Sequence, residues 1–121
     1  MDMRKPRANY RARGTYYEGA CAAWLEKRGY VIIDKNYRCR MGEVDLIARN
    51  EGYYVFIEVK FRQAQSMGAP YEAVNDRKQM KIRQTAQWYM MARHLPPQTP
   101  VRFDVVSICG SDIQLFKNAF Y

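Results

Sequence analysis

The segment Tyr53–Phe61 constrains the fold more than any other part of this chain. Its residues are almost all β-branched or aromatic, and only Glu58 and Lys60 carry a charge. This composition predicts a strand, and the two charged side chains interrupt a run that is otherwise typical of a buried segment. A buried ion costs several kcal/mol unless it is paired, hydrogen-bonded or metal-bound. The sequence therefore predicts that partners for these two side chains lie nearby.

A turn signal before this strand predicts which residues face it. The residues Asn-Glu-Gly at 50–52 are typical of a tight hairpin, and a two-residue loop there places Asp45 opposite Glu58 and Glu43 opposite Lys60. Because side chains alternate along a strand, all four lie on one face, with directly opposed Cβ atoms about 5 Å apart. An unbulged three-residue loop would instead turn one pair away.

The facing carboxylates Asp45 and Glu58 are a candidate metal site. Two such groups repel unless a proton or a cation lies between them, and at this spacing both can reach one Mg²⁺. Lys60 would add a fixed positive charge at the edge, a set that suits phosphoryl chemistry. The alternative is a structural cluster in which either carboxylate pairs with Lys60 or with a nearby arginine.

The other patterns predict helices and strands in the order α-β-β-β-α-β-β. The first helix has an apolar face and stops at Gly29, Asn75 is expected to cap the second helix, and prolines follow it. A basic loop is expected at 37–40, before the hairpin. The expected helices span 15–28 and 75–94, and the expected strands outside the hairpin span 30–36, 101–109 and 113–117.

Size and charge predict one small domain that faces a polyanion. Among 121 residues, Lys and Arg outnumber Asp and Glu by 20 to 12, a balance that attracts nucleic acid. Residues 1–13 are expected to form a flexible basic arm, followed by a single domain over 14–121. No segment has the roughly 20 apolar residues of a membrane span, and the cysteines lack metal or disulfide spacing. We therefore expect a cytoplasmic protein with no membrane partner.

Further charged residues have two interpretations each. Thr15 and Glu18 fit a capping box, yet Glu18 also lies near the apolar helix face, from which it could look toward the sheet. Arg102 and Asp104 share one strand face, where a structural pair is favoured over a functional role. Lys78 belongs to a mostly solvated helix face, but it lies on the inward side and can approach the site or a phosphate.

Short motifs are distributed over nearly the whole chain after the arm. The blocks that are specific together lie within Gly42-Glu43-Val44-Asp45-Leu46-Ile47-Ala48 and Phe56-Ile57-Glu58-Val59-Lys60-x-Arg62. The other matching residues are Gly14, Glu18, Ala22, Gly29-Tyr30, Asn36, Lys78, Ala86, Arg102-Phe103-Asp104-Val105-Val106 and Ala119-Phe120. Together they resemble the YraN family of small bacterial proteins. The order of elements, with a carboxylate on the second strand and Glu-x-Lys on the third, also resembles the PD-(D/E)xK superfamily of restriction enzymes and Holliday-junction resolvases.

This resemblance implies a restriction-endonuclease-like α/β fold with a three-layer core and a mixed central sheet. It implies that Asp45 and Glu58 bind Mg²⁺ or Mn²⁺ and that Lys60 orients or polarises the attacking water. Glu18 would be an additional acidic contributor from the first helix, and Glu43 a weaker one.

The implied function is nucleic-acid binding with metal-dependent endonuclease activity, on DNA in preference to RNA. The basic residues expected to contact nucleic acid are Arg38, Arg40, Arg62 and Lys78. Resolvases cut two strands symmetrically, so a homodimer is expected by analogy. Two alternatives remain open, a binding module of the same fold without catalysis and a basic protein-interaction subunit whose acidic cluster is only structural.

Overall fold

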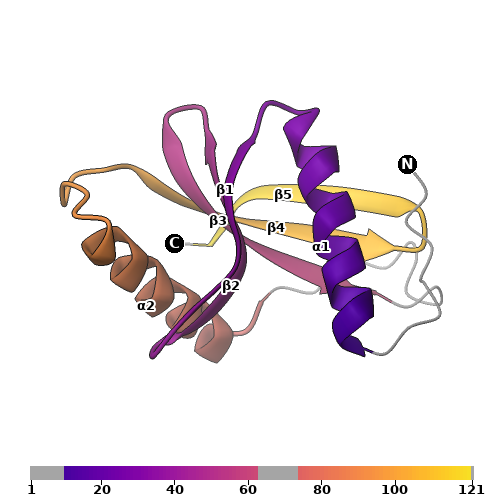
Figure 1. The fold of residues 1–121 in the computed structure, drawn as a ribbon, viewed down its shortest axis with the longest axis horizontal. Coiled ribbons are helices and arrows are strands. Elements are labelled where there is room, and N and C mark those ends of the chain that lie inside the picture. Colours follow the sequence, from indigo (N-terminus) through magenta and orange to yellow (C-terminus); the bar gives the residue numbers. More distant parts are fainter. Residues whose placement is uncertain (1–9, 63–73, 121) are drawn as a thin grey trace.

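Two helices cover opposite faces of one five-stranded sheet, forming three layers (Figure 1). The computed structural model describes the backbone of residues 10–62 and 74–120, and the side chains from residue 18 onward within those ranges. The predicted α/β class, three-layer core and order of elements are confirmed. The elements are α1 (Tyr10–Glu26), β1 (Val31–Cys39), β2 (Gly42–Asn50), β3 (Tyr53–Phe61), α2 (Asp76–Ala92), β4 (Val101–Cys109) and β5 (Asp112–Phe120).

The sheet is mixed, as predicted. Its strands follow the chain order β1-β2-β3-β4-β5, and only the β3–β4 pair within it is parallel. A parallel pair needs a long connection, and α2 lies in that connection. Neither of the described helices is long and apolar enough to span a bilayer.

The β2–β3 hairpin has the predicted register. Asn50 pairs with Tyr53 and Leu46 pairs with Ile57, which leaves Glu51 and Gly52 as the two loop residues. Their φ angles are 54° and 87°, and positive φ at both loop residues is the mark of a type I′ turn. Local turn chemistry therefore sets which residues of the two strands meet.

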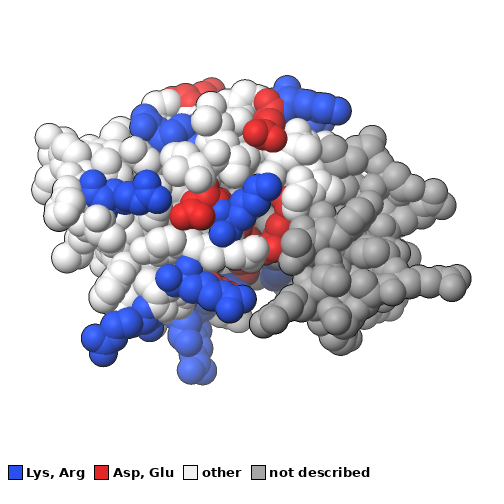
Figure 2. All heavy atoms as spheres, in the orientation of Figure 1, with Lys and Arg blue, Asp and Glu red and all other residues white. Residues whose placement is uncertain are grey.

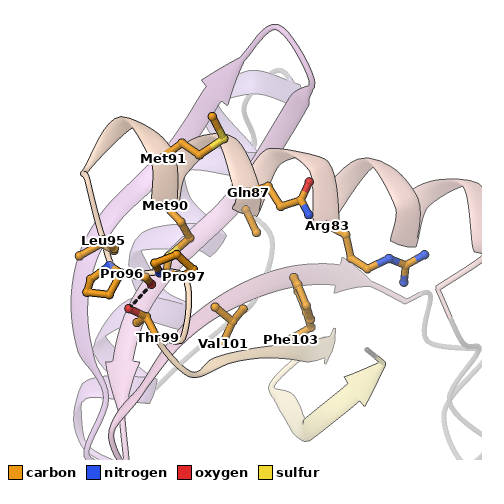
Figure 3. A pocket seen from close by; sticks show the side chains of 11 residues that line it. Arg83, Gln87, Met90, Met91, Leu95, Pro96, Pro97, Thr99, Val101 and Phe103 are labelled. Atoms are coloured by element: carbon orange, nitrogen blue, oxygen red, sulfur yellow. Dashed lines mark hydrogen bonds between the residues drawn. The ribbon is translucent and has the colours of Figure 1, made fainter.

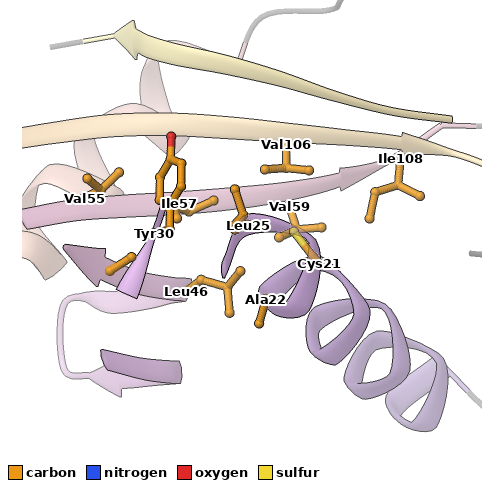
Figure 4. Close-up of a cluster of buried hydrophobic side chains, with 11 residues drawn as sticks. Cys21, Ala22, Leu25, Tyr30, Leu46, Val55, Ile57, Val59, Val106 and Ile108 are labelled. Atoms are coloured by element: carbon orange, nitrogen blue, oxygen red, sulfur yellow. The ribbon is translucent and has the colours of Figure 1, made fainter. Parts of the chain in front are cut away.

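One core cluster lies between α1 and the sheet (Figure 4). Cys21, Ala22 and Leu25 project from α1 onto alternate residues of the central strands. Cys21 and Leu25 are fully buried, as the apolar helix pattern predicts. The cluster holds α1 against the strand that carries Glu58. Its buried strand members are Leu46, Ala48, Val55, Ile57, Val59, Val106 and Ile108.

A second, more aromatic cluster lies beneath α2. The buried ring of Tyr89 makes edge contacts with Phe56 and Tyr37, at centroid distances of 5.6 and 5.1 Å. The buried residues of α2 are Ile82, Thr85, Ala86 and Tyr89. The predicted cap is also present, because the Asn75 side chain accepts a hydrogen bond of 2.9 Å from the backbone N–H of Lys78. This cap fixes the end of α2 that lies nearest to Glu58.

The Arg102–Asp104 pair is a buried structural network, as favoured from the sequence. Arg102 donates two hydrogen bonds to the Asp104 carboxylate, at 2.9 and 2.8 Å. The same carboxylate accepts hydrogen bonds from the Tyr30 hydroxyl and from the backbone N–H of Asn118. Asp104 is fully buried and Arg102 is 7% exposed, so the network ties β4 to β5 and to the start of β1 inside the protein.

The N-terminal boundary differs from the prediction. Helix α1 begins at Tyr10, so residues 10–13 of the expected arm are helical, and residues 1–9 lie outside the described part of the chain. Thr15 is therefore inside the helix and cannot be its N-cap, which rules out the capping-box interpretation of Glu18. The pattern failed here because a local start signal is a weak guide to where a helix begins, and a helix can continue past it.

Two strands are longer than predicted. The expected basic loop at 37–40 is wrong, because β1 continues to Cys39, where it pairs with Gly42. Strand β5 continues to Phe120 instead of ending at Lys117. Phe120 is buried and stacks on Phe103, so the last described residue of β5 packs on its own domain. Cross-strand pairing and ring packing outweigh the polar composition of these segments.

Candidate functional site

Strands β2 and β3 stop pairing midway along their length, and this separation creates the site. Their ladder ends at Leu46 and Ile57, although β2 begins at Gly42 and β3 runs to Phe61. Beyond this point, among the residues that the structure describes, β2 pairs only with β1 and β3 pairs only with β4. The backbone N–H of Val59 then donates a 2.8 Å hydrogen bond to the Asp45 carboxylate instead of to a strand carbonyl.

The side-chain alternation of β2 also breaks at this point. Leu46 belongs to the α1 cluster, whereas Val44 and Ile47 both belong to the α2 cluster. In a regular strand Val44 would share a face with Leu46, so the backbone near Asp45 departs from regular geometry. Asn36, within the facing part of β1, has a φ of 53°. Because of this irregularity, the Asp45 side chain need not follow the regular alternation between the two faces of the sheet.

The Asp45 carboxyl contacts two other acids. Burial raises its pKa to about 8, and the charge of Glu58 acts in the same direction. The Val59 N–H opposes this shift, and a hydrogen bond joins Asp45 to Glu58. Glu18 also forms a hydrogen bond with Asp45. At neutral pH and without a cation, Asp45 therefore holds a proton that it shares with these neighbours.

Glu18 faces the site, as the resemblance implied. Burial raises the pKa of its carboxyl, while a hydrogen bond from the Asn36 side chain lowers it. Glu18 comes from α1, whereas Asp45 and Glu58 come from the two separated strands. Acids from two layers of the fold thus converge.

Glu58 has a cationic partner from the opposite layer. The Lys78 ammonium on α2 lies 3.0 Å from a Glu58 oxygen. The Glu58 side chain is only 11% exposed, whereas the Lys78 side chain is 48% exposed. The predicted approach of Lys78 to the site is thus observed, and its charge offsets that of Glu58.

Glu43 and Lys60 do not pair as predicted. Glu43 lies 2.9 Å from Arg38, its cross-strand neighbour on β1, and both side chains are exposed. The strands have already separated at this level, so the hairpin register cannot bring Glu43 to Lys60. Lys60 follows Glu58 by two residues on β3 and therefore shares its face. Within the described part of the chain, no ion pair or hydrogen bond engages the Lys60 ammonium.

The other predicted basic residues border the site. Arg40 is exposed in the β1–β2 turn, and Arg62 follows β3, where its backbone N–H donates to the Ile108 carbonyl. In the orientation of Figure 1, acidic and basic side chains lie next to each other in the middle of the face, and further Lys and Arg side chains project from its lower edge (Figure 2).

These residues fit a hard divalent cation better than zinc. No group of three or more His, Cys, Asp and Glu residues within the described ranges is spaced to hold a metal by itself. Mg²⁺ is commonly bound by one or two carboxylates, with waters and substrate phosphates completing its octahedron. Asp45 and Glu58 are within hydrogen-bonding reach of each other, so both can contact one such ion. The donor set therefore suits Mg²⁺ or Mn²⁺.

A separate hollow lies away from the carboxylates, at the C-terminal half of α2 (Figure 3). Its volume is about 590 Å³, and it lies between α2, the proline-containing loop and the start of β4. Met90, Pro96 and Phe103 are among the apolar side chains that line it, and none of its described lining residues is acidic. Its chemistry does not match the metal site.

Asn36 is a site residue that the sequence analysis named only among the residues matching the family, without predicting a role for it. Its side chain orients Glu18, and its backbone adopts a positive φ that Asn tolerates better than most residues. A β1–β2 register would have placed it opposite Asp45, but the expected loop at 37–40 concealed that register. A first strand predicted to continue past residue 36 would have revealed this register.

The chain is similar to proteins of one bacterial family over most of its length. The model of the family described as "Uncharacterised protein family UPF0102" matches residues 17–108. A UPF0102 protein of Lachnoclostridium phytofermentans is 46% identical over 93% of this chain and 95% of its own length. UPF0102 proteins of Clostridium acetobutylicum and Clostridium botulinum are 42% and 40% identical, each over 88% of this chain and 92% of their own lengths. The chain therefore belongs to the uncharacterised protein family UPF0102, the YraN family.

Proposed function

We propose that this protein is a divalent-metal-dependent endonuclease that hydrolyses phosphodiester bonds in DNA. The observation that carries the proposal is the separation of β2 and β3, at which the carboxyls of Asp45 and Glu58 come within hydrogen-bonding reach of each other. Glu18 forms a hydrogen bond with Asp45 at the same place. The resemblance to the PD-(D/E)xK superfamily supports the same chemistry, because its motif falls on Asp45, Glu58 and Lys60.

Each group has a role that follows from its position. Asp45 and Glu58 would hold Mg²⁺ or Mn²⁺, and when bound the ion activates water and neutralises charge on the phosphate. Lys60, on the same face as Glu58, orients the water and stabilises the charge that develops during attack. Glu18 holds a proton or a water molecule beside Asp45, and Asn36 positions Glu18.

Basic residues near the site would hold the DNA backbone. The excess of Lys and Arg over Asp and Glu attracts a polyanion, and the exposed positions of Arg38 and Arg40 leave their side chains accessible from solvent. Lys78, which pairs with Glu58, and Arg62, which follows the strand that carries Glu58, would contact the phosphates next to the cleaved bond. Contacts of this kind position DNA without reading its sequence.

A cleavage screen tests the proposal. Branched, flap, single-stranded and duplex DNA are incubated with the protein in Mg²⁺, in Mn²⁺ and in EDTA. We expect metal-dependent cleavage of at least one substrate, its loss in Glu58→Gln, and its loss in Lys60→Ala with metal binding retained. The matched control Lys35→Ala removes an exposed lysine on β1 and should cleave normally. Cleavage that persists in EDTA or in Glu58→Gln would refute the proposed chemistry.

A second candidate is a DNA-binding module of the same fold without catalysis. Its support is that a proton on Asp45 and the ammonium of Lys78 already neutralise the cluster without any metal. This candidate predicts DNA binding that is indifferent to Mn²⁺ and no cleavage of any substrate. A protein that binds neither metal nor DNA would instead favour the protein-interaction alternative.

A further inference from the structure

The Glu58–Lys78 ion pair places a cation where a metal would need to bind. Lys78 lies 3.0 Å from a carboxylate oxygen that is otherwise available as a metal ligand. An ammonium and a divalent cation cannot share that oxygen without repelling each other. Metal binding must therefore displace the Lys78 ammonium from Glu58 or overcome the repulsion between the ammonium and the metal ion.

The Lys78 side chain can move while its helix stays in place. The Asn75 cap holds the backbone N–H of Lys78, and α2 packs closely on the start of β2 at Gly42. The side chain itself is nearly half-exposed, and a lysine has four rotatable bonds between backbone and ammonium. An anion at the mouth of the site can therefore draw the ammonium outward without disturbing the fold.

We propose that Lys78 couples metal binding to phosphate binding, by neutralising Glu58 in the free protein and transferring to a backbone phosphate when nucleic acid binds. This proposal rests on the proposed function, because it assumes that Glu58 is a metal ligand. In the free protein Lys78 competes with the metal. In the complex the phosphate holds Lys78, and Glu58 becomes available to the metal. Metal and DNA then each strengthen the binding of the other by the same factor.

The first experiment measures metal binding without DNA. Mn²⁺ is titrated into the wild type, Lys78→Gln and Lys81→Gln, and free Mn²⁺ is followed by electron paramagnetic resonance. We expect Lys78→Gln to bind Mn²⁺ about tenfold more tightly, within the range usual for coupled sites. Lys81→Gln removes the same charge from an exposed position of α2 and should change the affinity much less. Weaker or unchanged Mn²⁺ binding in Lys78→Gln would overturn the proposal, because a lysine that only braces Glu58 predicts that result.

The second experiment measures the coupling itself. Affinity for a short duplex DNA is measured by fluorescence anisotropy in Ca²⁺ and in EDTA. Wild type should bind DNA about tenfold more tightly with the metal, and Lys78→Gln should lose most of that gain. An equal gain in both proteins would refute the coupling while leaving the metal site intact. A wild type that binds no metal in either experiment would refute the proposed function itself, so the two failures are distinguishable.

Discussion

At the scale of the residue, the surroundings of Asp45 raise the pKa of its carboxyl to about 8. Its carboxyl is buried among other acids, and one of its oxygens replaces a strand carbonyl as the acceptor for Val59. These surroundings favour the neutral form in the free protein. A metal that needs the charged form must therefore compete with a proton, and its affinity should rise with pH up to about 8.

The raised pKa of Asp45 predicts how folding stability depends on pH. A carboxyl whose pKa is higher in the folded state stabilises the fold fully below its ordinary pKa, and this contribution is lost as pH rises toward about 8. Asp45→Asn removes the titrating group, so the variant should not show this loss. Relative to wild type, its free energy of unfolding should rise by roughly 1–3 kcal/mol as the pH increases from about 4 to about 8. Urea denaturation of both proteins across this range measures the difference.

The exposed Asp112→Asn is the matched control, and it should follow the wild-type pH profile. If Asp45→Asn loses stability relative to wild type as pH rises, the carboxylate is a charged member of a structural ion-pair cluster. In that case the metal-site interpretation fails at its central residue.

At the scale of the element, the site depends on how closely α2 approaches β2. Gly42 starts β2 with a φ of 147°, and a Cβ built there would lie 3.1 Å from the Thr85 hydroxyl oxygen on α2. A Cβ at this position would press on the Thr85 hydroxyl, which would have to shift by a few tenths of an ångström. The missing Cβ of Gly42 thus permits the close contact between the start of β2 and α2, the helix that carries Lys78.

Gly42→Ala should therefore destabilise the protein and weaken the approach of α2. We expect a loss of about 1–3 kcal/mol in the free energy of unfolding, from backbone strain together with the Thr85 contact. Adding Thr85→Ala removes the hydroxyl that the new Cβ would contact. The double variant should therefore lose less stability than the sum of the two single losses. Gly29→Ala is the control, because Gly29 has a φ of 90° and nothing within 4 Å of its Cβ position. Additive effects of Gly42→Ala and Thr85→Ala would contradict the contact.

The Arg102–Asp104 network belongs to this scale as well, because it joins three strands. Asp104→Ala leaves the buried Arg102 without its main partner, so unfolding should become easier by roughly 3–5 kcal/mol. Chemical denaturation measures this loss, and Mn²⁺ titration of the folded variant should give the wild-type affinity. A variant that folds well but loses metal binding would instead assign Asp104 to the functional site.

At the scale of the whole molecule, the sequence predicted the fold better than it predicted the site. The hairpin register was predictable because the loop at Glu51 and Gly52 is a local feature. The separation of the strands was not, because it depends on Asn36 and Asp45 leaving regular geometry on two strands at once. The sequence predicted only that Lys78 can approach the site. Its ion pair with Glu58 was not predictable, because that contact depends on where α2 lies in space.

The net positive charge predicts DNA binding that depends strongly on salt and little on sequence. Each neutralised phosphate contributes about −0.9 to the slope of log K against log salt concentration on duplex DNA. Removing residues 1–9, which contain Arg4, Lys5 and Arg7, should make this slope shallower without unfolding the domain that begins with α1. Anisotropy titrations at several salt concentrations measure both slopes, with circular dichroism as the check on folding. An identical slope would show that these basic residues do not contact DNA.

The bond from the Val59 amide to the Asp45 carboxylate makes one backbone proton a reporter on the whole site. Its acceptor is a side chain that a metal would engage, whereas nearby amides of β3 are tied to the ladder with β4. In an amide NMR spectrum the Val59 resonance should therefore shift with added Mg²⁺, while the signals of β4 stay in place. The Val59 amide peak can thus follow metal occupancy without a substrate or a turnover.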